Sequence, residues 1–324
     1  MELDLWIAIG FIAAISGLAL IAGRRLSLSV YHNRPLLFAE CLVFSLVFAF
    51  GLSNRLSWAC AFPTSAALCW SNWMPIFLAL TAGLASEISA LRPWWRRGVS
   101  VTMCLLAAGF LLLPVARPRI FPIEVAERGT WKDGVCLQSH EASCGPAAVA
   151  TLLHQTATLT PTRLSYGPGH WASAPPNSAE QLMSHACLTS TQGTSSLGLV
   201  RGLRLALAGS DRIVRVAESD PAAWSAMHQL PNVAVVRFRD QRNDGAVDQL
   251  LRNDHEGHAV VVHSRTKDGR WRIADPAVGW ETWDDDRLRR VFTGEAIYLA
   301  SPASRAKASE RPNPKLLRRK FEEG

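Results

Sequence analysis

The sequence predicts an α+β domain that follows an N-terminal bundle of about four transmembrane helices. The long apolar runs of the 324-residue chain are concentrated in residues 1–116. After them, helix-like patterns come first and short strand-like runs follow, which is typical of an α+β fold. We therefore expect two structural units, one in the bilayer and one outside it.

Four apolar stretches have about the ~20 residues that a helix needs to cross a hydrocarbon core of about 30 Å. They are residues 5–22, 36–52, 73–91 and 98–116. Glu40 and Glu87 stand within or at the edge of two stretches, where an acid either reaches the interface or marks a functional site. Pro63 interrupts the moderately apolar segment 58–70, so we expect an interfacial or re-entrant piece there.

The basic residues indicate how these helices are oriented in the plasma membrane. An acidic start precedes the first stretch and Arg24 and Arg25 follow it, which is the reverse of a secretory signal peptide. The loops after the first and third stretches are basic, whereas the loop between them has only Arg55. The positive-inside rule therefore predicts an extracytoplasmic soluble domain. The basic run at 315–320 would suit a cytoplasmic leaflet and weighs slightly against this orientation.

The net charge of +7 does not by itself indicate a nucleic-acid partner. The chain has no basic-aromatic stripe, no finger spacing and no Gly-rich phosphate loop, so nucleic-acid binding is not predicted. The histidines and cysteines of the chain show no metal-ligand spacing, and we predict neither a metal nor another cofactor.

The soluble part begins after a proline-punctuated linker at 117–132 and extends over residues 133–300, with a basic tail at 301–324. We expect helices at 145–155, 179–186 and from 194 onward, and strands at 233–238, 259–263 and 271–274. A Lys-Asp-Gly-Arg sequence at 267–270 signals a hairpin between the last two strands.

Four residues in this part suggest thiol chemistry. Cys144 stands where the first helix begins, and a helix N-terminus favours the thiolate over the thiol. His258 could take the thiol proton and later protonate a leaving amine, while Asp275 would orient the imidazole. Gln138, six residues before the cysteine, could donate its amide N–H to a developing oxyanion.

The hairpin leaves the pairing of His258 with Asp275 open. If Asp268-Gly269 forms a two-residue turn, Asp275 lies opposite Val262, so a longer loop or a bulge is needed to bring acid and imidazole together. His263 is a competing base, but its position five residues along the strand predicts that it faces the other way.

These motifs resemble those of the bacteriocin-processing peptidase family C39, which is papain-like. The family pattern is a glutamine, then Asp-Cys-Gly at the head of a helix, later His-aromatic-Val-Val, and then Asp-Pro before a glycine. This chain has Gln138, Cys144-Gly145, His258-Ala-Val-Val-Val and Asp275-Pro276-Ala-Val-Gly279, and the resemblance covers about residues 133–300. It implies a thiol protease that cleaves a peptide or precursor protein after a double-glycine leader.

The chain also departs from the family pattern. Ser143 replaces the usual aspartate, Ala259 replaces the usual aromatic, and residues 239–256 look like an insertion. Exporter-fused members carry the peptidase ahead of six spans and an ATPase, whereas here four predicted spans come first and no Gly-x-x-x-x-Gly-Lys-Ser/Thr loop is found. We therefore expect the bilayer, and a separate ABC exporter, as partners.

Other interpretations stay open at this level. A catalytically inactive peptide-binding accessory protein of an export system would carry the same motifs, and acyl transfer or deamidation would use the same residues. Cys136 and Cys187 could form a disulfide if the domain is extracytoplasmic.

Overall fold

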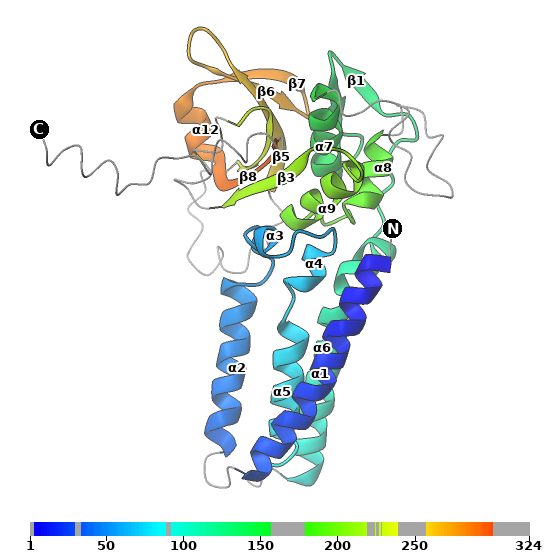
Figure 1. Cartoon of the computed structure of the whole chain (residues 1–324), viewed down its shortest axis with the longest axis vertical. Helices are drawn as coiled ribbons and strands as arrows, with labels where there is room; N and C mark the ends of the chain where they lie inside the picture. Colours follow the sequence, from blue (N-terminus) through cyan, green and yellow to red (C-terminus); the bar gives the residue numbers. More distant parts are fainter. Residues whose placement is uncertain are drawn as a thin grey trace, which may run out of the picture.

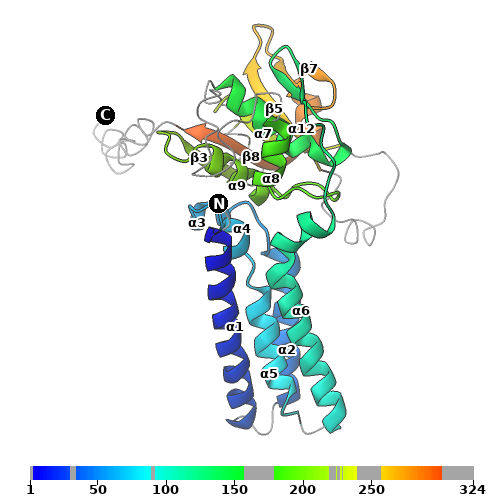
Figure 2. The same ribbon diagram turned by 90° about the vertical axis from the view of Figure 1, so that its right-hand side faces the viewer.

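The computed structural model consists of an elongated helical bundle with an α+β domain at one end (Figures 1 and 2). It describes residues 3–29, 34–88, 92–156, 179–218, 224, 227, 229–238 and 257–300. The expected insertion at 239–256 and the basic tail at 301–324 lie outside the described residues.

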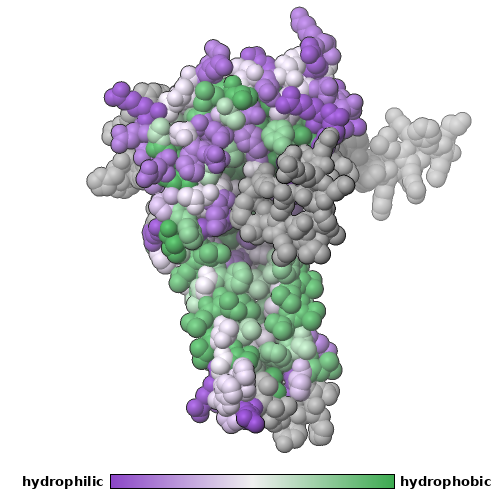
Figure 3. Space-filling view, turned by 180° about the vertical axis from the view of Figure 1, so that it is seen from behind, coloured by the Kyte–Doolittle hydropathy of each residue, from purple (hydrophilic) through white to green (hydrophobic). Residues whose placement is uncertain are grey.

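The bundle contains the helices α1 (Leu3–Ser29), α2 (Arg34–Gly51), α5 (Met74–Ala85) and α6 (Pro93–Ile120). Two short helices, α3 (Trp58–Ala61) and α4 (Ala67–Trp70), lie between α2 and α5 at the end next to the domain (Figure 1). Four helical stretches of the described chain are long and apolar enough to cross a membrane, the third of them being Ala67–Ala85. Figure 3 shows apolar side chains around the bundle, between the polar surface of the domain and polar residues at the far end.

Helix α6 runs four residues beyond the predicted span and contains Pro114 and Pro118. A proline has no N–H to donate to the carbonyl four residues earlier, which for Pro114 is that of Phe110. Asn72 donates its side-chain N–H to this carbonyl at 2.6 Å instead. A side chain from a neighbouring segment thus satisfies the freed backbone carbonyl, and the helix continues.

Helix α5 ends at Ala85, so Glu87 lies beyond the helix rather than inside a span. Its carboxylate accepts a hydrogen bond from Arg24 at 3.0 Å, and its backbone carbonyl accepts one from Arg34 at 2.8 Å. The acid is therefore paired with the basic residues at the end of the bundle away from the domain (Figure 1).

The domain is built on an antiparallel six-stranded sheet in the order β3-β8-β4-β5-β6-β7. Its strands are β3 (Ile213–Glu218), β4 (Asn232–Arg237), β5 (Gly257–Arg265), β6 (Trp271–Asp275), β7 (Gly279–Trp283) and β8 (Phe292–Ala300). A separate ribbon pairs β1 (Thr130–Lys132) with β2 (Val135–Leu137). The α+β prediction is confirmed, and the three strands predicted from residue 233 onward correspond to β4, β5 and β6.

Alternating side chains of the sheet enter two cores. Ala259 and Val261 of β5 pack in a cluster with α7 (Cys144–Gln155), α8 (Ala179–Ala186) and α9 (Ser196–Ala206). Val260 and Val262 pack on the other face with Leu288 of α12 (Asp285–Val291). The side chains of β5 thus alternate between the two cores, and both faces of this strand are buried.

Two arginines of α9 join the domain to the bundle. Arg201 is almost fully buried and lies 3.1 Å from Asp4, at the start of α1. Arg204 donates to three backbone carbonyls of the segment between α2 and α5, at Ala59, Phe62 and Thr64. Segment 58–70 therefore serves as a platform on which α9 sits (Figure 2).

Candidate active site

Cys144 is the first residue of α7, and the turn before it is held by side chains. A one-turn 3-10 helix at Glu141–Ser143 is capped by His140, whose Nδ1 accepts the N–H of Ala142 at 3.0 Å. The Ser143 hydroxyl accepts the backbone N–H of His140 at 3.1 Å and donates to the His140 carbonyl at 2.7 Å. These bonds place the Cys144 sulfur at the N-terminus of α7, where backbone N–H groups favour an anion.

A bulge in β5 sets the register of the hairpin. The first cross-strand pair after the turn is Arg265 with Trp271, so the loop is longer than the two-residue turn considered from the sequence. The register then shifts around His263, after which Val261 lies opposite Ala274. The longer loop and the bulge together slide the end of β6 along β5.

His258 and Asp275 consequently meet on one face of the sheet. Continuing the register by one pair places Asp275 opposite Val260, two residues from His258, and such diagonal neighbours are within reach of longer side chains. The His258 Nε2 lies 2.7 Å from the Asp275 Oδ1. The same carboxylate oxygen accepts the backbone N–H of Ala277 at 2.8 Å, which fixes it in the turn after β6.

His258 also interacts with the thiol of Cys144. Because Nε2 faces Asp275, the ring nitrogen that remains for the sulfur is Nδ1. Burial raises the pKa of the Cys144 thiol, but the hydrogen bond and charge of His258, together with the N–H groups of Ala259 and Gly145, outweigh burial. The pKa of Cys144 is therefore below that of an ordinary thiol.

The pKa values of the imidazole and the carboxylate are shifted in the directions that favour the charged form of each group beside the thiol. Burial lowers the pKa of His258, but hydrogen bonds and charges from Asp275 and Cys144 raise it to about 9. Burial raises the pKa of Asp275, but His258, the Ala277 N–H and the charge of Arg287 bring it below its usual value. These pKa values thus favour a thiolate at Cys144, an imidazolium at His258 and a carboxylate at Asp275.

Gln138 lies between the segments that carry the other candidates. Its backbone N–H donates at 2.8 Å to the carbonyl of Pro276, the residue after Asp275. Its Nε2 donates to the His140 carbonyl at 3.3 Å, and its buried Oε1 has no hydrogen-bond partner within the described ranges. The direction of this amide toward an oxyanion stays a prediction.

His263, the competing base, stands at the other end of α7. Its Nδ1 lies 2.9 Å from the Oε1 of Gln155, the last residue of the helix that begins with Cys144. A 12-residue helix is about 18 Å long, so the two histidines contact opposite ends of it.

The remaining cysteines of the domain are chemically different from Cys144. Cys136 and Cys187 are buried and free, so they do not form the disulfide considered from the sequence. Burial raises the pKa of each to about 12. In the described part of the chain, no group of three or more His, Cys, Asp or Glu side chains is arranged to hold a metal ion.

Two residues near the site were not singled out from the sequence. Phe238, half exposed and directly after β4, has its ring centroid 6.0 Å from that of His258. Glu180 of α8 is fully buried and accepts the backbone N–H of Ser139 at 2.8 Å. An acid in the first turn of a helix is ordinarily a surface residue, so no sequence signal marked Glu180.

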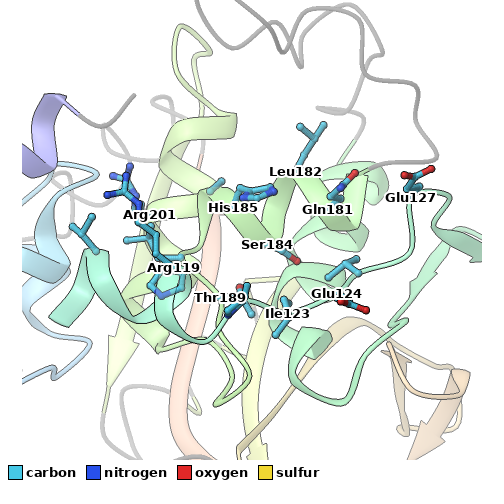
Figure 4. A pocket seen from close by; sticks show the side chains of 16 residues that line it. Arg119, Ile123, Glu124, Glu127, Gln181, Leu182, Ser184, His185, Thr189 and Arg201 are labelled. Carbon is cyan, nitrogen blue, oxygen red and sulfur yellow. The ribbon is translucent and has the colours of Figure 1, made fainter.

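A separate cavity of about 790 Å³ lies between the end of α6, the segment that follows it and α8 (Figure 4). Its charged and polar lining includes Arg119, Glu124, Glu127 and His185. Cys144, His258 and Asp275 are not among its lining residues, so it is distinct from the candidate active site.

No family model and no curated protein matches this chain. Three similar solved structures are peptidases of transporters. The peptidase domain of Streptococcus ComA, a bifunctional ABC transporter involved in a quorum-sensing pathway, is 20% identical over 51% of this chain and 96% of its own, with a TM-score of 0.34. A double-glycine-motif protease from an AMS/PCAT transporter, in complex with the leader peptide, is 19% identical over 55% of this chain and 99% of its own, with a TM-score of 0.35. The peptidase domain of Streptococcus mutans ComA is 20% identical over 51% and 96%, with a TM-score of 0.32.

Proposed function

We propose that this chain is a membrane-anchored cysteine peptidase with a papain-like arrangement of its catalytic groups. The observation that carries the proposal is the row formed by Cys144, His258 and Asp275, in which the imidazole is hydrogen-bonded to the carboxylate and lowers the pKa of the thiol. A lowered thiol pKa beside a raised imidazole pKa is the condition for a resting thiolate–imidazolium pair.

In the proposed reaction, the Cys144 thiolate attacks the carbonyl carbon of a peptide bond. The imidazolium of His258 gives its proton to the departing amine, which leaves an acyl-thioester. A water molecule then loses a proton to His258 and attacks the thioester, which releases the acid and restores the thiolate. Asp275 keeps the ring in one orientation through both steps.

Gln138 is the proposed oxyanion donor, with the backbone N–H of Cys144. At 3.3 Å, its present bond to the His140 carbonyl is longer than usual, so turning the amide toward a developing oxyanion loses little. Fixed donors of this kind stabilise the charge of the tetrahedral intermediate.

We propose a peptide or precursor protein with a double-glycine leader as substrate, which rests on the motif resemblance.

The location of the domain is proposed from charge. Arg24 and Arg25 lie toward the end of the bundle opposite the domain, where α6 also begins with Arg96 and Arg97. By the positive-inside rule the domain would be extracytoplasmic, where it would act on peptides delivered by a separate ABC exporter.

Cleavage of a Gly-Gly peptide by the full chain in detergent tests the proposal. We expect hydrolysis products of the mass given by one added water, and no product from Cys144→Ala. Cys60→Ala is the matched control, because Cys60 is exposed and lies outside the site. A peptide that binds but stays intact would favour the inactive accessory protein, and a product joined to an amine would indicate acyl transfer.

A further inference from the structure

A buried acid beside the site has no part in the proposed reaction. Glu180, the second residue of α8, is fully buried. Its Oε1 accepts the backbone N–H of Ser139 at 2.8 Å, and its Oε2 is buried without a hydrogen-bond partner among the described residues. Burying a carboxylate is costly, so a position that retains one calls for a specific role.

The partner of Glu180 lies in the segment that leads to the nucleophile. Three consecutive backbone N–H groups of this segment are each bound by a different part of the molecule. That of Gln138 donates to Pro276, that of Ser139 to Glu180, and that of His140 to the hydroxyl of Ser143. The segment is thus clamped from the turn after β6, from α8 and from its own cap.

The Glu180 contact is the middle clamp of the three. The N–H that it binds belongs to Ser139, the residue after Gln138. Among the described residues, the side chain of Gln138 is held only by the hydrogen bond to the His140 carbonyl, at 3.3 Å. The hydroxyl of Ser139 is engaged elsewhere, because it accepts the N–H of Ala126 at 2.9 Å. Glu180 Oε1 accepts this N–H at the ordinary hydrogen-bond distance of 2.8 Å, so Glu180 is well suited to hold this backbone in place.

We propose that Glu180 is a positioning residue for the oxyanion side of the active site, acting on Gln138 through the backbone N–H of Ser139. The inference rests on the proposed peptidase function. Glu180 itself does not contact the reacting atoms. It restricts the backbone from which the Gln138 amide projects, and a misplacement of about 1 Å in such a group can cost on the order of 100-fold in rate.

A double-mutant cycle between the two residues tests this role. Glu180→Ala should lower kcat by about 10-fold or more while KM changes little, since the lost contact matters for the transition state rather than for binding. In the Gln138→Ala background the same substitution should have almost no further effect on kcat. Glu180→Gln keeps an oxygen acceptor of the same reach and should retain most of the activity. Equal losses in both backgrounds would overturn the proposal.

A second measurement does not depend on hydrolysis. Amide hydrogen exchange over residues 138–143 should speed up in Glu180→Ala but not in Glu180→Gln, while α7 beyond its first turn stays protected. Unchanged exchange in the alanine variant would refute the clamp. Failure of the peptidase proposal would appear differently, as a wild-type chain that does not cleave while its segment 138–143 still loosens in Glu180→Ala.

Discussion

The imidazole of His258 lies 2.7 Å from the carboxylate of Asp275, although the two residues are not direct partners across the sheet. The continued register places Asp275 opposite Val260, and the pair forms diagonally. The bulge at His263 and the longer loop create this diagonal. Details of backbone register therefore decide whether the imidazole of His258 is paired with an acid.

Deletion of His263 should leave His258 and Asp275 paired. Val262 and Ser264 already lie opposite the neighbouring residues Ile273 and Arg272, so without His263 the two strands form a regular ladder with the same partners. Cleavage and fast thiol alkylation should therefore persist in the deletion variant, whereas both should be lost in His258→Ala. A deletion variant as inactive as His258→Ala would contradict this register.

The pH profile should have two limbs with assignable causes. The thiolate forms above the lowered pKa of Cys144, and the imidazolium is lost above the pKa of His258, which is about 9. Alkylation and kcat/KM should therefore rise below the ordinary pKa of a thiol, and kcat/KM should decline near pH 9. Asp275→Asn removes a group that raises the pKa of His258, so its alkaline limb should move to lower pH. An unmoved limb would contradict the assignment.

Alkylation should also distinguish the cysteines of the domain. Cys144 is half-buried with a lowered pKa, whereas burial raises the pKa of Cys136 and Cys187 to about 12. Brief treatment of the native chain with iodoacetamide at neutral pH should modify Cys144 first, as read by mass spectrometry of peptides. All three should react after denaturation. In His258→Ala the modification of Cys144 should slow, and equal rates in both proteins would exclude the paired base.

The attachment of the domain to the bundle should depend on Arg204. Its three hydrogen bonds to backbone carbonyls of the platform join α9 to the segment between α2 and α5. Arg204→Ala should lower the free energy of unfolding in detergent by about 2 kcal/mol, the scale of a hydrogen bond to a charged group. Arg270→Ala is the control, since Arg270 is exposed and pairs locally with Asp268. Equal melting temperatures in the two variants would argue against the attachment.

Two glycines offer a matched test of helix packing in the bundle. A methyl group on Gly83 of α5 would lie 2.2 Å from the backbone oxygen of Leu20 in α1, whereas one on Gly109 of α6 meets nothing within 4 Å. Gly83→Ala should therefore destabilise the bundle by about 1–3 kcal/mol. Gly109→Ala should be neutral in the same thermal assay. Similar effects at both positions would mean that α1 and α5 do not pack this closely.

Local features of the site could be predicted because their causes are local. Cys144 begins a helix and His258 lies near the start of a strand because hydrophobic period and end signals are written in adjacent residues. The sequence left the length of the hairpin turn open, since turn length depends on the pairing of whole strands. Helix α6 continues through Pro114, as the predicted span 98–116 does, and there Asn72, distant in sequence, donates to the freed carbonyl of Phe110.

The sequence by itself determined the division into apolar helices and an α+β domain, and it pointed to Cys144, His258, Asp275 and Gln138. Composition and short-range pattern carry that information. The tertiary structure decided the diagonal contact of His258 with Asp275, the attachment of Gln138 to the turn after β6, and the burial of Glu180 against Ser139. These contacts join residues far apart in the chain, and only the packing of strands and helices brings their atoms within hydrogen-bonding distance.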